Sequence, residues 1–173
     1  MTPAAARALR SEGRHADARD MLVALAASRP ADAEIQYEAA AVHDSLGDEA
    51  GAVPYYIAAI AGGLSGAQRR SAYLGLGSTY RTLGRYLEAE ATLREGLALF
   101  PEANELKLFL AMVEHNLGRS KQALEALLVL LAETSADDTI RRYRRAIAFY
   151  AEDIDRAWPA ANVRTDVPAG TES

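Results

Sequence analysis

Apolar residues recur at helical spacing near the end of the chain. From residue 140 onward, large apolar residues lie three or four positions apart, which places their side chains on one face of a helix. They are Ile140, Tyr143, Ile147, Tyr150, Ile154 and Trp158. Ser135 and Asp138 match a capping box, a signal that begins a helix. The pattern predicts one helix over residues 136–158, ended by Pro159, and a flexible tail over residues 159–173.

Upstream of this segment, the pattern of apolar and small residues repeats. Each copy has a glycine followed five residues later by an alanine, and successive glycines lie 34, 37 and 34 residues apart. The pairs are Gly13 and Ala18, Gly47 and Ala52, Gly84 and Ala89, and Gly118 and Ala123. Such a glycine ends one helix, and the small alanine lets the next helix pack closely against it. The pattern therefore predicts about four helical hairpins, which must stack to bury their apolar faces.

The third copy carries the fullest set of repeated residues. They are Tyr73, Leu76, Gly77, Tyr80, Gly84, Tyr86, Ala89, Leu93, Gly96, Leu97 and Pro101. With the repeat length, they resemble the tetratricopeptide repeat family. The resemblance implies an all-α, right-handed superhelix of about four hairpins plus the terminal capping helix, a single domain over residues 1–158. The runs at residues 42–47 and 53–56 are also similar to a bacterial subfamily of uncharacterised role.

The resemblance also implies a concave groove, lined by the first helix of each hairpin, that receives a peptide or helix of a partner protein. Alignment on the glycines gives the expected contact residues. They are Tyr37, Glu38, Leu74, Ser78, Arg81, Leu108, Phe109, Met112 and His115, with Ala41, Asp44 and Gly75 at matching positions and Arg7 and Arg10 at one end. An alternative is that the terminal helix folds back over Leu108, Phe109 and Met112 and makes them core.

Arg141, Arg142, Arg144 and Arg145 form the densest basic cluster in the sequence. Such a cluster can contact phosphate or RNA. However, Asp137 and Asp138 precede Arg141 and Arg142 by four residues, which is the favourable spacing for ion pairs within a helix. Because surface aromatics are not expected between the arginines, an ordinary solvated helix face is the preferred interpretation.

The composition adds limits on function. A net charge of −5 disfavours nucleic acid and anionic membranes as partners, and the chain has no cysteine. The three histidines lie far apart, without the spacing of a metal or catalytic motif. No apolar run reaches the roughly 20 residues that a membrane span needs. The sequence thus predicts a cytoplasmic, non-enzymatic scaffold or adaptor without a cofactor, which binds another protein or, alternatively, forms a homodimer through its groove or terminal helices.

Overall fold

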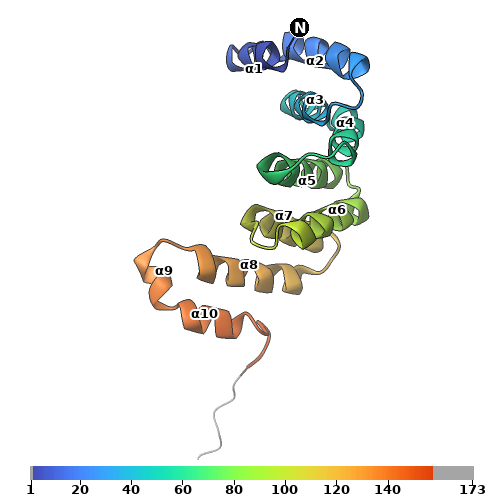
Figure 1. Ribbon diagram of the computed structural model, residues 1–173. Coiled ribbons are helices and arrows are strands. Elements are labelled where there is room, and N and C mark those ends of the chain that lie inside the picture. The colour runs from blue at the N-terminus through green and yellow to red at the C-terminus, as the bar shows by residue number, and fades with distance from the viewer. Residues whose placement is uncertain (1, 158–173) are drawn as a thin grey trace, which may run out of the picture.

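The computed structural model describes residues 2–157 and is entirely helical over that range (Figure 1). The helices are α1 (Pro3–Ser11), α2 (His15–Ser28), α3 (Ala33–Ser45), α4 (Glu49–Ala61), α5 (Gly66–Thr82), α6 (Tyr86–Leu99), α7 (Asn104–Asn116), α8 (Ser120–Thr134), α9 (Asp138–Arg142) and α10 (Arg144–Tyr150). Each helix through α8 packs on the next one. Helices α1 to α8 form four hairpins stacked along one axis, which confirms the predicted all-α superhelix.

The repeated glycines end the first helix of each hairpin. Their φ angles are 77° at Gly13, 71° at Gly47, 73° at Gly84 and 81° at Gly118. This left-handed conformation is strained for residues with a Cβ atom, so the sequence places glycine there. The alanine five residues later is buried in all four copies and lies in the second helix of the hairpin. Sequence periodicity therefore predicted both the turn and the close contact.

The two helices of the third hairpin pack closely. A Cβ atom added at Gly77 of α5 would lie 2.6 Å from Cγ of Leu93 in α6, and one at Gly96 would lie 2.9 Å from Cβ of Tyr73. Tyr73 and Leu93 are almost completely buried in the larger of two apolar clusters. The small residues thus let large side chains fill the space between the helices.

Ion pairs close the N-terminal end of the stack. Glu38 of α3 is buried, and its two carboxylate oxygens accept hydrogen bonds from Arg7 (2.8 Å) and Arg10 (3.0 Å) of α1. A smaller apolar cluster beneath them joins the first hairpin to α3. Because a carboxylate with low exposure needs partners, Glu38 fixes the short helix α1 on the second hairpin.

The terminal segment differs from the single helix predicted over residues 136–158. It divides at Tyr143 into α9, which extends away from the stack, and α10, which returns along α8 (Figure 1). Asp137, not Ser135, caps α9 by accepting a hydrogen bond from the backbone N–H of Thr139. Lys121 of α8 forms ion pairs with Asp153 (2.5 Å) and Asp155 (3.1 Å), which join α8 to the chain after α10. Trp158 and residues 159–173 lie outside the described residues.

Candidate functional site

The expected contact residues divide into two groups along the concave side. In the N-terminal half, Glu38 is engaged by α1, and Tyr37 lies partly buried with its ring centroid 6.3 Å from that of Tyr56. Leu74 is also partly buried against the larger apolar cluster. These three side chains take part in contacts within the stack, so this half of the surface is largely occupied by the fold itself.

A partly buried carboxylate lies between the second and third hairpins. Asp44 accepts hydrogen bonds from the hydroxyls of Tyr56 (2.6 Å) and Thr79 (3.0 Å). Burial raises the pKa of Asp44, although both hydrogen bonds act in the opposite direction. Asp44 and Thr79 border a small polar cavity with the predicted contact Ser78. The alignment placed Asp44 in the groove but gave no sign of this network, which depends on a tyrosine from α4.

In the C-terminal half, the predicted residues remain accessible. Leu108 and Met112 of α7 are each 37% exposed, and His115 is exposed beside the hydroxyl of Ser120. The alternative in which the terminal helix covers Leu108 and Met112 is therefore wrong, because α10 packs on α8 instead. Phe109 is partly buried, but it packs against the apolar cluster shared by the second to fourth hairpins.

A pocket of about 310 Å³ opens between α7 and α8, and we call it the end pocket. It contains three predicted contacts, namely Arg81, Met112 and His115. Five further lining residues were not predicted: Ala111, Ser120, Ala123, Leu124 and Leu127. The sequence held a signal for two of them, because Leu124 and Leu127 form an apolar stripe with Leu131 at helical spacing on α8.

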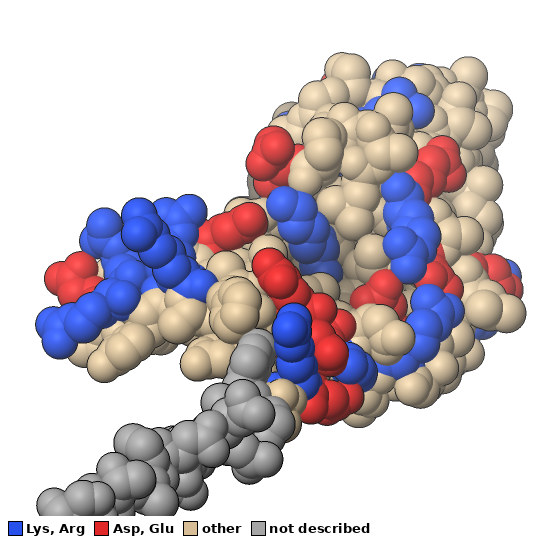
Figure 2. All heavy atoms as spheres, turned by 90° about the horizontal axis from the view of Figure 1, so that it is seen from below, with Lys and Arg blue, Asp and Glu red and all other residues tan. Residues whose placement is uncertain are grey.

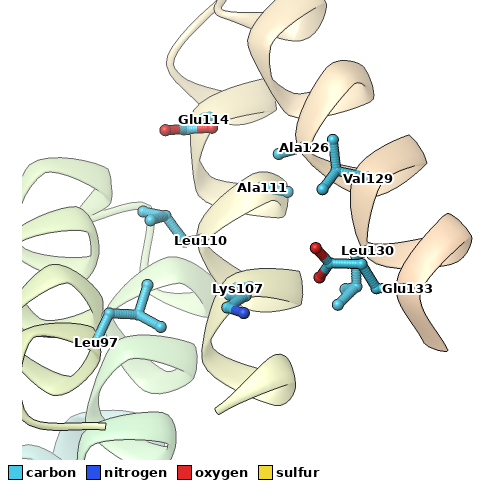
Figure 3. A pocket seen from close by; sticks show the side chains of 9 residues that line it. All are labelled: Leu97, Lys107, Leu110, Ala111, Glu114, Ala126, Val129, Leu130 and Glu133. Atoms are coloured by element: carbon cyan, nitrogen blue, oxygen red, sulfur yellow. The ribbon is translucent and has the colours of Figure 1, made fainter. Parts of the chain in front are cut away.

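A second pocket, of about 290 Å³, lies between α6, α7 and α8 (Figure 3). Leu97 and Leu110 line one side of it, and Val129 and Leu130 line the other. It contains none of the predicted contact residues. It shares only Ala111 with the lining of the end pocket, so the two hollows lie on different sides of α7 and α8.

The arginine cluster lies over α9 and the start of α10, away from the body of the stack (Figure 2). Arg141 pairs with Asp138 at 3.1 Å, one residue closer in sequence than expected, because Asp137 caps the helix. Tyr143 stands among the arginines and is 62% exposed. The expectation that surface aromatics would be absent here was therefore wrong, since the helix breaks at Tyr143 and leaves its ring outside the stack.

His43 lies in the interior of the second hairpin, at a position that holds tyrosine in the third. Its Nδ1 lies 2.7 Å from a carboxylate oxygen of Asp48, and its ring stacks on Tyr55. Its Nε2 is buried without a hydrogen-bond partner among the described residues. Within residues 2–157, no group of three or more His, Asp or Glu side chains is arranged to hold a metal ion. The helices of that range also include none that is long and apolar enough to cross a membrane.

The stacked hairpins and the open concave side define a helical-repeat protein of the kind that binds other proteins. Comparison with family models agrees, because residues 33–154 match the model described as tetratrico peptide repeat. The chain belongs to the tetratricopeptide repeat family, whose repeats generally mediate protein–protein interaction. The match omits the first hairpin and includes α9 and α10. Among curated proteins, none matches the chain.

Proposed function

We propose that the protein is a non-enzymatic docking module of the cytoplasm that holds a peptide or helix of a partner protein on its concave side. The observation that carries the proposal is the accessible apolar surface of α7, where Leu108 and Met112 are exposed and Met112 lines the end pocket. Exposed methionine and leucine side chains adapt to the apolar face of a bound segment. The polar groups of Arg81 and His115 beside them would orient that segment.

The C-terminal half of the groove is the better candidate for the contact surface. Tyr37, Glu38 and Leu74 are held by contacts within the stack, so a partner would gain little apolar burial from them. Leu108, Met112 and the end pocket still offer apolar area that binding would remove from water. We therefore place the main contact on α7, with Arg81 of α5 at its edge.

The test is capture of native partners by two double variants. Leu108→Glu with Met112→Glu adds charge to the concave surface, and Leu87→Glu with Ile57→Glu adds the same charge at exposed leucine and isoleucine sites on second helices. We expect the first variant to lose proteins that the wild type captures from native cell extract, while the second keeps them. Equal capture by both variants, with unchanged circular dichroism, would contradict a groove on α7.

Self-assembly is the competing function, and it has a direct test. If the wild type sediments as a dimer that Leu108→Glu with Met112→Glu converts to a monomer, the concave surface joins two copies and partner docking there is wrong. We expect the wild type to sediment as a monomer over the concentration range of the capture experiment.

A further inference from the structure

Each inner hairpin is covered by the first helix of the next one. Helix α7 lies on α5 and α6, where Arg81 donates a hydrogen bond to Asn116 (2.8 Å). From α6, Arg94 pairs with Glu114 of α7 (3.0 Å), and Glu90 pairs with Arg119 (2.7 Å), which follows α7 at the start of α8. Leu93 lies among these contacts and is completely buried. A following first helix thus occupies a fixed place on both helices of the hairpin before it.

The end pocket is the same place on the fourth hairpin. His115, Leu124 and Leu127 stand one repeat after Arg81, Glu90 and Leu93. Helix α10 contacts α8, but no residue of α9, α10 or the described chain after them lines the end pocket. The chain after α10 instead reaches the face of α8 that carries Lys121 and Glu125. Lys121 pairs there with Asp153, and Glu125 accepts the backbone N–H of Ile154 (3.1 Å). Leu124 is consequently 46% exposed and Leu127 only partly buried.

We propose that the end pocket receives an amphipathic helix of a partner protein, which lies where the first helix of a fifth hairpin would lie and carries carboxylates along one edge. This inference rests on the proposed docking function and names the partner class. Most of the pocket lining is apolar and includes Met112, Leu124 and Leu127, and its polar residues include Arg81 and His115, which we call its rim. Since no carboxylate lines it, an acidic edge on the guest finds donors and no like charge.

The contact face of the guest helix should be more apolar than that of an internal first helix. On α6, Glu90 and Arg94 meet charged partners from the following repeat. The matching residues on α8 are Leu124 and Leu128. An ion pair cannot form with these leucines, so a charged guest residue opposite them would be desolvated without a partner. Apolar side chains at those places would instead extend the leucine stripe of α8.

Charge also argues against the protein's own terminal segment as the occupant of the end pocket. The segment around α9 and α10 carries Arg142, Arg144 and Arg145, which form no ion pair within the described residues. Docking the arginine-bearing part of that segment, residues 141–145, from the same chain or from a second copy, would bring arginines toward Arg81. Like charges at close range disfavour this arrangement. The rim of the end pocket therefore favours an acidic helix from a different protein.

Two synthetic helices, stapled to keep them helical and labelled with fluorescein, test the proposal on the full chain. Both have a leucine stripe, and one has glutamates along its edge where the other has lysines. Fluorescence anisotropy should show that the acidic helix binds at least about tenfold more tightly than the basic one. Leu124→Glu should weaken binding of the acidic helix by about tenfold or more. The control Leu87→Glu, at a leucine that is 69% exposed on α6, should leave it unchanged.

A negative charge added at the rim sharpens the result, because His115→Glu should shift preference toward the basic helix. Equal affinity for both helices, or equal binding to wild type and Leu124→Glu, would overturn the proposal. So would a wild-type dimer that Leu124→Glu dissociates, since the pocket would then belong to a second copy. If neither helix binds while the Leu108 and Met112 variant still loses native partners, this inference fails and the proposed function stands.

Discussion

Leu93 and Leu127 occupy the same position in the third and fourth hairpins, but they have different surroundings. Leu93 is completely buried between α5, α6 and α7, whereas Leu127 lines an open pocket. The identical residue is core in one repeat and accessible surface in the next because only the third hairpin has a following first helix stacked on it. In a stacked array, burial is thus a property of the neighbour as well as of the residue.

The largest expected effect comes from truncating these two leucines. Leu93→Ala should lower the free energy of unfolding by about 3 kcal/mol, because it leaves a cavity in a closed core. Leu127→Ala should cost only about 1 kcal/mol, since that side chain already borders solvent. Urea denaturation of both variants measures the difference. Equal losses would mean that the end pocket is closed in solution.

Gly77→Ala gives the third hairpin the residue that the fourth hairpin has at the same position, which is Ala111. The new Cβ would lie 2.6 Å from Cγ of Leu93, which has no room to withdraw. We expect a loss of about 2 kcal/mol in the free energy of unfolding from overpacking. If Leu93→Val is introduced as well, part of that loss should return, measured by the same denaturation. No recovery in the double variant would place the strain elsewhere.

The matching positions of the third and fourth hairpins also show how far the sequence could predict the fold. The glycine and alanine period predicted the turns and the close contacts, because both depend on the local backbone. It could not predict that Tyr143 breaks the terminal segment, since the apolar spacing there suits one continuous helix. The ion pairs of Lys121 with Asp153 and Asp155 join residues distant in sequence. The apolar spacing therefore could not predict that the chain after α10 lies against α8.

The candidate site was predicted only in part, for a related reason. Alignment on the glycines identifies side chains on the first helices, so it found Met112 and His115. It assumes that every groove position is free, whereas Glu38 is engaged by Arg7 and Arg10. It also leaves out the second helices, which contribute Leu124 and Leu127 to the end pocket. Those residues join the groove surface only because the stack ends there.

The third and fourth hairpins also differ in charge, which predicts a pH effect. Hydrogen bonds from Arg119 lower the pKa of Glu90 to about 2, and Arg94 acts in the same direction. Because the pKa of Glu90 is lower in the folded state than in the unfolded state, the ionised carboxylate stabilises the folded protein at pH values above the unfolded-state pKa. This contribution is lost as the pH falls toward 2. Between pH 6 and pH 3, the wild type should lose about 1 kcal/mol more than Glu90→Gln in free energy of unfolding, after allowance for solvent screening. Parallel pH dependence of the two proteins in urea denaturation would contradict this role.

Leu124 matches Glu90 in position, but no following repeat contacts it, so Leu124→Glu should be the mildest change. An exposed side chain loses little packing on substitution, and we expect the free energy of unfolding to change by less than about 0.5 kcal/mol. Glu90→Leu, the reverse exchange, should cost more because it removes the partner of Arg119. Urea denaturation of both variants tests whether the loss in free energy of unfolding depends on the position in the repeat or on contacts with a following repeat. A large loss for Leu124→Glu would show that the leucine stripe of α8 is covered within the isolated protein.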